Sequence, residues 1–176
     1  PHAERYGNEG TFPFILCPSR LESLKRQDLL IRAMVHVPEP VSAYIVGEGG
    51  MQESFRALAE NLGVSHRIRF LGHTDQTQLL RLYAHCLGVF FGPHDEDYGY
   101  ITLESMLSSK PVITCSDSGG PLEFVLHDQT GLIVPPEPEA VAAAVNQLAT
   151  NPARARQMGH DARSHYEAMD ISWDRA

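Results

Sequence analysis

Two basic and two acidic residues lie at spacings that could do chemistry on a phosphate-linked ligand. Arg20 and Lys25 follow the apolar segment 12–17. Arginine forms paired hydrogen bonds with a phosphate and lysine acts as a compact positive charge, so the two could hold a diphosphate. Glu96 lies in a later polar loop and precedes Glu104 by eight residues. Each charge alone would be an ordinary surface residue, but together the four are candidates for one binding site.

The segment 100–109 has the periodicity of a helix, with Glu104 among its apolar positions. At about 100° per residue, the apolar arc of this helix comprises Ile101, Leu103, Met106 and Leu107. Glu104 falls inside that arc, so we expect it on a buried face. A buried carboxylate is costly unless it is hydrogen-bonded, and ligand hydroxyls could supply the partners. The alternatives are an exposed edge of the arc or a structural ion pair.

The start of the same helix is a predicted anion site. The backbone N–H groups of Tyr100, Ile101 and Thr102 lack partners within the helix, and the helix dipole favours negative charge there. Glu96 lies in the loop that leads to these amides, so its carboxylate would face whatever a bound phosphate carries. Two aspartates flank Glu96, so a solvated acidic loop is the alternative interpretation.

Glycines cluster in two other loops. Gly47, Gly49 and Gly50 follow the second apolar segment and predict a close approach of the backbone to a ligand. Their G-x-G-G spacing, after the second segment rather than the first, disfavours the G-x-G-x-x-G site of an NAD enzyme. Gly119 and Gly120 predict a turn, which either only reverses the chain or presents backbone amides to a sugar.

The elements that would position these loops alternate along the chain. Six short apolar segments predict strands, at 12–17, 41–47, 67–72, 87–92, 111–115 and 130–134. Amphipathic segments predict helices at 26–37, 51–63, 76–86, 100–109, 137–150 and 152–167, with a short helix within 116–128. Strands that alternate with helices form a parallel sheet, and continuously apolar strands indicate helices on both faces. We therefore expect a Rossmann-like α/β fold, with a doubly wound six-stranded parallel sheet.

In such a sheet, ligands bind outside the carboxyl ends of the strands. The loops with unusual residues follow the first, second, fourth and fifth predicted strands, so we expect them at one edge of the sheet. Residues 1–12 are predicted to be a linker, 13–167 the domain and 168–176 a tail. The chain does not begin with methionine, which suggests a fragment or a processed form.

Composition argues against several classes of protein. The 176 residues carry a net charge of −8, which disfavours the basic face of a nucleic-acid-binding domain. No apolar run reaches the ~18 residues of a membrane span. The three cysteines, Cys17, Cys86 and Cys115, are expected to be buried thiols in a reducing cytoplasm. The nine histidines have no zinc-binding spacing, so we expect no metal site.

Seven segments along nearly the whole chain together resemble glycosyltransferase family 4. They are S-R-L-x3-K at 19–25, V-G-E-G at 46–49, R-I-R-F-L-G at 67–72, E-x7-E at 96–104, S-D-S-G-G-P-L-E-F-V at 116–125, T-G-L-I-V-P-P at 130–136 and S-W-D at 172–174. Each segment is short, and it is their order and spacing that make the set specific. The resemblance implies the C-terminal half of a retaining enzyme with the GT-B fold, whose active site lies between two Rossmann-like domains.

The resemblance also implies a role for each candidate residue. The donor would be a nucleoside-diphosphate sugar such as a UDP- or GDP-hexose, and no cofactor would be needed. Arg20 and Lys25 would hold the diphosphate and Glu96 would touch the transferred sugar, which makes these three the catalytic candidates. Glu104 would bind the ribose hydroxyls. The other donor-binding positions would be Gly47, Gly49, Arg69 and Phe70 near the base, Gly99, Tyr100, Ile101 and Thr102 at the diphosphate, and Gly119 and Gly120 at the sugar.

A missing N-terminal domain would bind the acceptor, which could be a sugar, a lipid-linked glycan or a small molecule. The chain alone would then bind a donor without transferring it. The enzyme would be cytoplasmic, with any attachment to the inner face of the membrane made by the missing domain. Three positions depart from the family's pattern. Ser19 and Arg26 replace common glycines, and Asp97 replaces the first glycine of E-G-F-G, so the identity of the donor stays open.

Two other functions also stay open. Asp95 and Asp97 form a D-x-D sequence, by which some metal-dependent glycosyltransferases hold Mn²⁺ or Mg²⁺. The domain could instead bind a nucleotide sugar without any catalysis. A signalling receiver domain is disfavoured, because no predicted central strand ends in an acidic phosphate acceptor.

Overall fold

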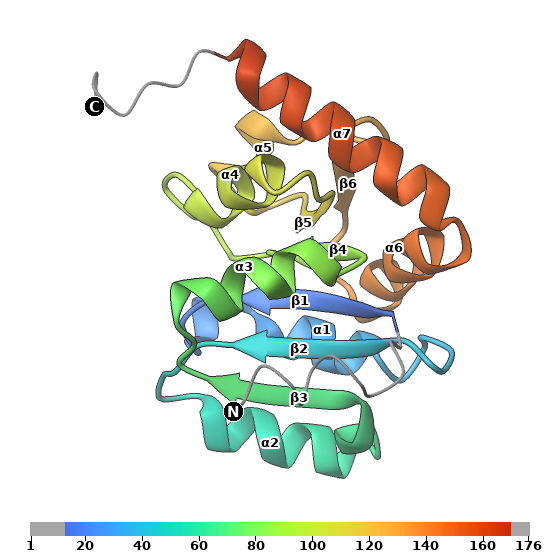
Figure 1. The fold of residues 1–176 in the computed structure, drawn as a ribbon. Coiled ribbons are helices and arrows are strands. Elements are labelled where there is room, and N and C mark those ends of the chain that lie inside the picture. Colours follow the sequence, from blue (N-terminus) through green and yellow to red (C-terminus); the bar gives the residue numbers. More distant parts are fainter. Residues whose placement is uncertain (1–12, 170–176) are drawn as a thin grey trace.

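A computed structural model of the chain describes residues 13–169, which contain one six-stranded sheet. The strands are β1 (Phe14–Pro18), β2 (Ser42–Val46), β3 (Ile68–Gly72), β4 (Gly88–Phe90), β5 (Val112–Cys115) and β6 (Gly131–Val134). All pairings between them are parallel, in the order β3-β2-β1-β4-β5-β6 (Figure 1). This is the strand order of the Rossmann fold, so the predicted fold class is confirmed.

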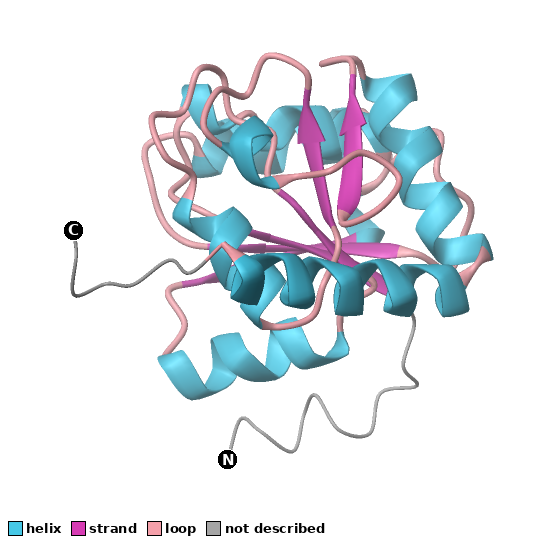
Figure 2. Cartoon of the chain, turned by 90° about the horizontal axis from the view of Figure 1, so that it is seen from above, coloured by secondary structure: helices cyan, strands magenta, loops and turns pink. Residues whose placement is uncertain are grey.

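Helices connect the strands and cover both faces of the sheet (Figure 2). They are α1 (Gln27–Ala33), α2 (Gln52–Asn61), α3 (Gln76–His85), α4 (Tyr100–Leu107), α5 (Pro121–Phe124), α6 (Pro138–Thr150) and α7 (Pro152–Ala168), with short 3-10 turns η2 (Ser23–Lys25) and η3 (Ser65–Arg67). Every helix lies within a segment predicted as helical, apart from one residue at the end of α7. The loop between β4 and α4 has no regular structure, as its polar sequence predicts.

The strands alternate their side chains between two apolar cores. On one face, Ile15 and Cys17 of β1 belong to a core that α1, α2 and α6 complete. On the other face, Phe14 and Leu16 pack against the buried residues of α3. Burying one such apolar side chain stabilises a fold by ~1.5–3 kcal/mol. Both clusters consist of hydrophobic residues, so the charged residues that could contact a ligand must lie outside them, in the loops and on the outer faces of the helices.

Helix α7 packs against both sides of the molecule. Ala155 and Met158, in its first half, belong to the core formed with α1 and α6. Ala162 and Tyr166, in its second half, pack with Leu103 of α4 and with α5. The helix therefore runs past the β6 edge of the sheet and covers it (Figure 1). A covered edge cannot pair with another chain.

Helix α1 is shorter than predicted. It ends at Ala33, whereas the apolar pattern predicted helix to position 37. Beyond Ala33 the chain tightens into turns, in which Val35 N–H donates to Arg32 and His36 N–H donates to Ala33. The side chain of Arg67 then donates to the carbonyls of Met34 and Val37. A distant arginine therefore satisfies backbone groups that a longer helix would have paired internally.

Two expectations fall outside the part of the chain that the structure describes. The predicted linker 1–12 and the S-W-D segment 172–174 both lie there, as does most of the predicted tail. Within residues 13–169, no helix is both long and apolar enough to cross a bilayer.

Candidate functional site

The centre of the sheet is the point at which its strand order reverses. β1 and β4 are neighbours there, while the chain continues from β1 towards β2 and from β4 towards β5. Loops after such a pair diverge, and ligands of doubly wound sheets bind between them. We call residues 19–26, after β1, the cationic rim segment, and residues 91–99 and 116–120, after β4 and β5, the acidic rim segments.

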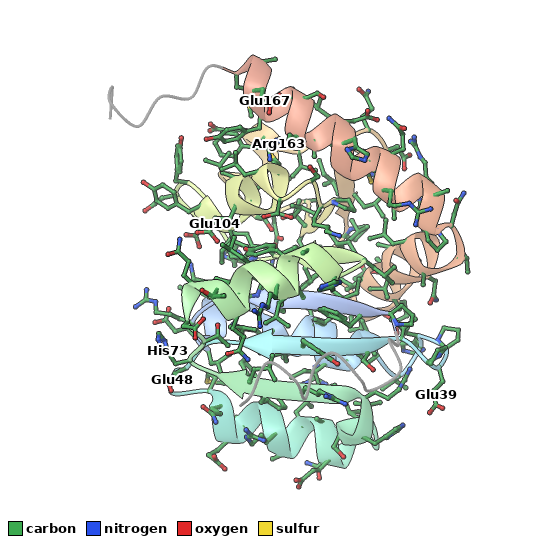
Figure 3. The ribbon with its side chains drawn as sticks, viewed as in Figure 1. Glu39, Glu48, His73, Glu104, Arg163 and Glu167 are labelled. Carbon is green, nitrogen blue, oxygen red and sulfur yellow. The ribbon has the colours of Figure 1, made fainter. Side chains whose placement is uncertain are left out.

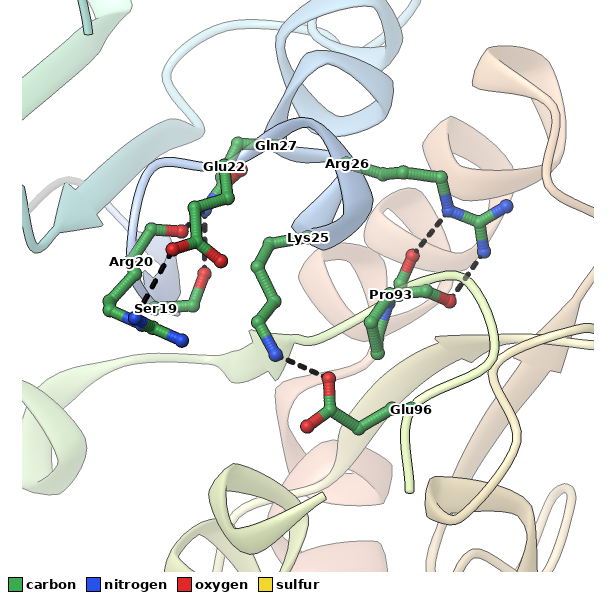
Figure 4. Close-up of polar contacts among 9 residues, drawn as sticks. Ser19, Arg20, Glu22, Lys25, Arg26, Gln27, Pro93 and Glu96 are labelled. Atoms are coloured by element: carbon green, nitrogen blue, oxygen red, sulfur yellow. Dashed lines mark hydrogen bonds and ion pairs between the residues drawn. The ribbon is translucent and has the colours of Figure 1, made fainter. Parts of the chain in front are cut away.

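Lys25 and Glu96 meet across this point. The ammonium group of Lys25 forms an ion pair with Oε2 of Glu96, although the residues are 71 positions apart (Figure 4). Their side chains are only 17% and 24% exposed, so the pair is shielded from solvent. The Lys25 Nζ also lies 5.8 Å from the ring centroid of Phe91. Two of the predicted catalytic residues are therefore brought together, one from each side of the sheet's centre.

Arg20 lies in the same rim segment but points elsewhere. Its side chain is 76% exposed and forms an ion pair of 3.2 Å with Glu22, its near neighbour (Figure 4). Buried Gln27 holds this part of the loop, because its Nε2 donates to Ser19 Oγ and to the Arg20 carbonyl, at 2.6 and 2.7 Å. Arg20 and Lys25, which were predicted to hold one diphosphate together, are thus each paired with a different glutamate.

Arg26 makes the most extensive contacts of the rim. Its Nε donates to the Gly92 carbonyl at 2.8 Å, and its Nη2 donates to the Pro93 carbonyl at 2.6 Å (Figure 4). The guanidinium also binds both carboxylate oxygens of Asp117, at 2.9 and 2.6 Å. This hydrogen-bonded ion pair holds the pKa of Asp117 below its usual value. The sequence identified Arg26 only as a departure from a family pattern and assigned no role to Asp117.

Gly119 and Gly120 support the loop that carries Glu96. The Glu96 N–H donates to the Ser118 carbonyl at 2.9 Å, and the Gly120 N–H donates back to the Glu96 carbonyl at 2.6 Å. Gly119 has a φ of +73°, and a side chain there would place its Cβ 2.6 Å from the Glu96 carbonyl oxygen. The Gly120 amide predicted to face a sugar is therefore bonded to the protein itself.

The glycines after β2 have the same kind of role. A Cβ on Gly47 would collide with the Ser19 carbonyl, and a Cβ on Gly49 with the Leu21 carbonyl. Leu21 N–H in turn donates to the Glu48 carbonyl at 3.0 Å. Gly47 and Gly49 thus pack closely against the cationic rim segment, whereas a Cβ on Gly50 would meet nothing within 4 Å. The predicted approach of this loop to a ligand stays a prediction.

The first turn of α4 is only partly available to an anion. Its N-cap is Gly99, in a left-handed conformation with φ +81°. The Thr102 N–H donates to the Gly99 carbonyl at 2.9 Å, so the expectation that this amide is free was wrong. The rings of Tyr98 and Tyr100 are both exposed and lie 4.9 Å apart beside this turn, and Ile101 is partly buried beneath them. Two exposed aromatic rings, one from the loop and one from the first residue of α4, therefore lie at the helix start.

Glu104 was predicted on a buried face, and this prediction was wrong. The buried residues of α4 are Thr102, Leu103, Ser105 and Met106, whereas Glu104 is exposed. Tertiary packing rotates the helix so that its polar small residues face inward and Glu104 lies at the edge. There the Tyr83 hydroxyl donates to Oε2 of Glu104 at 3.1 Å. Burial of Tyr83, together with the Glu104 charge, raises the pKa of the phenol.

Figure 3 relates these residues to the direction of the strands. Glu104 lies on the side to which the arrows of β2 and β3 point, as do Glu48 and His73, which belong to loops at that edge. Glu39, which precedes β2, lies at the opposite end. The two carboxylates of the E-x7-E segment thus both belong to the carboxyl side of the sheet.

Arg69 and Phe70 lie along β3 rather than beyond it. Arg69 is in register with Tyr44 in the middle of β2, and its guanidinium carbon lies 5.3 Å from the Tyr44 ring centroid. Phe70 is partly buried, with the Arg56 guanidinium 4.8 Å from its ring. Arg69 therefore covers a face of the sheet, three residues before the end of β3, where a base was expected.

The three cysteines are buried. Burial raises the pKa of Cys17 and of Cys86 to about 12, and that of Cys115 to about 11. The prediction of buried thiols is confirmed. Among residues 13–169, no three His, Cys, Asp or Glu side chains are grouped as metal ligands. Asp95 and Asp97 of the D-x-D sequence are both exposed.

Three supporting residues had no role in the prediction, namely Asp117, Tyr83 and Gln27. Gln27 and Tyr83 lie within predicted helices and Asp117 lies in a predicted loop. Their partners come from a distant part of the chain or from a loop whose path the sequence does not specify. The sequence could have indicated Gln27 and Tyr83 only because each is a hydrogen-bonding residue beside apolar residues of a predicted helix.

The strand order defines a Rossmann-like α/β domain, the fold that is also found in GT-B glycosyltransferases. More specifically, the chain belongs to the family described as glycosyl transferases group 1, whose sequence pattern matches residues 2–165.

Its relatives act on different substrates. A GDP-mannose-dependent α-(1-6)-phosphatidylinositol monomannoside mannosyltransferase of Mycolicibacterium smegmatis is 34% identical, over 97% of this chain and 47% of its own length. A glycogen synthase of Mycobacterium tuberculosis is 34% identical, over 73% of this chain and 31% of its own length. The structure of Anabaena HepE in complex with UDP and glucose has a TM-score of 0.86 at 25% identity, covering 95% of this chain and 47% of that one. The chain thus spans about half or less of the length of these relatives.

Proposed function

We propose that this chain is the donor-binding domain of a retaining glycosyltransferase that transfers a hexose from a nucleoside-diphosphate sugar. The observation that carries the proposal is the Lys25–Glu96 pair at the reversal point of the sheet, with Glu104 eight residues further on the same edge. The pair joins a cation suited to phosphate and an acid suited to a sugar. The relatives support this ligand class, since one depends on GDP-mannose and the HepE structure holds UDP and glucose.

In the proposed reaction, the bond between the anomeric carbon and the diphosphate breaks, and negative charge grows on the leaving phosphate. The acceptor's hydroxyl oxygen bonds to the anomeric carbon, and its proton passes to a leaving-phosphate oxygen. Lys25 neutralises that charge, aided by the start of α4 and by Arg20 once it leaves Glu22. Fixed charges in a shielded site are effective because they need no reorganisation during the reaction. Glu96 then faces the sugar, and Glu104 binds the ribose hydroxyls while Tyr83 orients its carboxylate.

The resting Lys25–Glu96 pair has a consequence for binding. An ammonium group has three donors, so Lys25 can donate to a phosphate oxygen while keeping one bond to Glu96, or can exchange Glu96 for the phosphate. In either case the incoming diphosphate competes with a carboxylate already in place. The donor's sugar would then occupy the space beside the Glu96 carboxylate.

The test is a calorimetric titration of this chain with UDP, GDP and ADP and with their sugars. Tight binding of one nucleotide, weakened by Lys25→Ala and unchanged by Arg156→Ala on exposed α7, supports the proposal. No binding of any of the six ligands would refute it. Repeating the titration in EDTA distinguishes the metal-dependent alternative at Asp95 and Asp97, which requires affinity to fall.

Catalysis needs the acceptor-binding half, so we expect donor binding without transfer by this chain. Joined to its N-terminal half, it should transfer the sugar with retention of anomeric configuration, which the configuration of the product establishes. Binding without transfer in the full-length protein would instead identify a non-catalytic nucleotide-sugar-binding domain.

A further inference from the structure

Arg26 adopts a backbone conformation that is unusual for a residue with a side chain. Its φ of 52° and ψ of 41° place it in the left-handed region, where it ends η2 and begins α1. Residues with a Cβ are strained there, and such strain persists where surrounding contacts enforce it. The contacts of the Arg26 side chain therefore need an explanation beyond local geometry.

Those contacts join all three rim segments. From the cationic rim segment, the guanidinium reaches two carbonyls after β4 and the carboxylate of Asp117 after β5. The Arg26 side chain is 15% exposed, so the hydrogen bonds are largely protected from water. A bidentate arginine–carboxylate pair fixes direction as well as distance.

The bridge lies beside the Lys25–Glu96 pair (Figure 4). Lys25 precedes Arg26 in the chain, and Glu96 follows Pro93, whose carbonyl Arg26 binds, by three residues. In Figure 4 the two side chains diverge, with Lys25 directed to Glu96 and Arg26 directed to Pro93. Asp117, the ion-pair partner, accepts the Asp95 N–H at its own backbone carbonyl, at 3.1 Å. Arg26 thus contacts the segment that carries Glu96 directly, at Gly92 and Pro93, and also binds Asp117, to which that segment is hydrogen-bonded.

We propose that Arg26 is a positioning residue, which through Asp117 and the carbonyls of Gly92 and Pro93 holds the Lys25 ammonium and the Glu96 carboxylate at one fixed separation. This inference rests on the proposed function for its ligand, but the bridge itself is a property of the chain. Arg26 acts through Lys25 and does not bind the donor. All four of its hydrogen bonds are to the protein.

The main variant is Arg26→Gly, because glycine accepts the left-handed backbone and the change removes only the side chain. The probes are UDP and GDP, titrated against this chain well below its melting temperature. We expect the affinity for whichever nucleotide binds to fall about tenfold. Arg156→Ala, which removes one positive charge from α7, is the matched control and should leave the affinity unchanged.

A double-mutant cycle separates positioning from direct contact. If Arg26 acts through Lys25, the chain carrying both Arg26→Gly and Lys25→Ala binds no more than about twofold worse than Lys25→Ala alone. If the two losses multiply, Arg26 contacts the donor itself and the proposal is overturned. An Arg26→Gly chain with wild-type affinity also overturns it, even if its melting temperature falls.

A second measurement does not depend on nucleotide binding. Arg26→Gly should speed hydrogen exchange at the amides of Asp95 and Glu96, which bond to the Asp117 and Ser118 carbonyls, while amides of α6 keep their protection. Unchanged protection at both positions overturns the proposal. If the wild-type chain binds neither UDP nor GDP, this exchange experiment alone decides on Arg26. The proposed function fails only if ADP and the three nucleotide sugars do not bind either.

Should Arg26→Gly fail to fold, Asp117→Asn tests the same bridge from its other end without disturbing the backbone of residue 26. It retains the two carbonyl bonds of Arg26, so the expected loss of affinity is smaller, about threefold. Arg26→Lys keeps the charge but loses the bidentate geometry, and we expect affinity between that of Arg26→Gly and wild type. Wild-type affinity and exchange in both variants would overturn the proposal.

Discussion

The two sides of the sheet's reversal point differ in charge and in how they are held. The cationic rim segment carries Arg20, Lys25 and Arg26 within seven residues, whereas the acidic rim segments carry Asp95, Glu96, Asp97 and Asp117. Without a ligand, the two sides neutralise one another through two ion pairs that span 71 and 91 positions of the chain. The two pairs differ in role. We propose that the bidentate Arg26–Asp117 pair holds the rim segments together, and that a ligand's phosphate competes with Glu96 for Lys25.

The largest effect should come from removing the exchangeable cation. If Lys25 binds the donor's diphosphate as proposed, Lys25→Ala deletes a charge-assisted contact worth ~1.5–3 kcal/mol. Nucleotide affinity should therefore fall about 10- to 100-fold, as measured by calorimetry against the Arg156→Ala control. An effect of less than twofold would contradict the assignment of Lys25 to the phosphate.

The next-largest effect should come from Glu104, the second acidic residue proposed to contact the donor. Glu104→Gln should weaken binding of a nucleoside diphosphate about tenfold, because a carboxylate binds ribose hydroxyls more strongly than an amide does.

Tyr83→Phe removes only the hydroxyl that orients Glu104, at a cost of ~0.5–1.5 kcal/mol. It should weaken the same ligand about threefold, and should have no effect in a Glu104→Gln background. An additive effect of the two changes would show that Tyr83 does not act through Glu104.

Neutralising the other member of the exchangeable pair should have the opposite sign. Glu96→Gln frees Lys25 and removes a negative charge from beside the diphosphate site, so UDP or GDP without a sugar should bind about threefold more tightly. Transfer by the full-length protein should nevertheless fall, since the acid at the sugar is lost. Weaker binding of the free nucleotide in Glu96→Gln would mean that the pair organises the site rather than competing for it.

The smallest effect is on acid stability, and it concerns the supporting pair. Since the pKa of Asp117 is lowered when folded, its pairing stabilises the fold fully above its unfolded pKa of about 3.9. That contribution is lost as the pH falls through the lower, folded value. Arg26 and His94 face this carboxylate, and the pair is partly exposed, which limits the effect to less than ~1 kcal/mol. The Asp117→Asn chain should therefore be less stable than wild type near neutral pH, and the difference in melting temperature should shrink as the pH falls below 4. Thermal unfolding at several pH values measures this difference.

The sequence predicted the fold well because each predicted strand is a short apolar run between polar breaks. It also predicted that Lys25 and Glu96 lie at one edge, since both follow parallel strands. It did not predict the exposure of Glu104, because a helical wheel shows which residues share a face but not which face the neighbours cover. Thr102 and Ser105 are buried on α4 in place of Glu104, an outcome set by packing against the rest of the domain.

The supporting contacts of the site were also beyond prediction. Gly47, Gly49, Gly119 and Gly120 signalled tight backbone packing, but a glycine in a sequence does not state whether its neighbour is a ligand or another loop. Arg26 signalled nothing by its residue type, since its significance depends on a left-handed backbone and on carbonyls 66 and 67 positions away. Such contacts follow from loop paths, which local sequence patterns do not determine.

The three buried thiols make the chain suited to site-specific labelling. Alkylating reagents react with thiolates, and with pKa values of about 11 and 12 only about one native thiol in 10³ to 10⁴ is ionised at pH 8. An exposed cysteine introduced as Asp97→Cys, next to Glu96, should therefore capture a maleimide dye almost alone. Fluorescence from that dye would report events beside the Lys25–Glu96 pair without removal of any native cysteine.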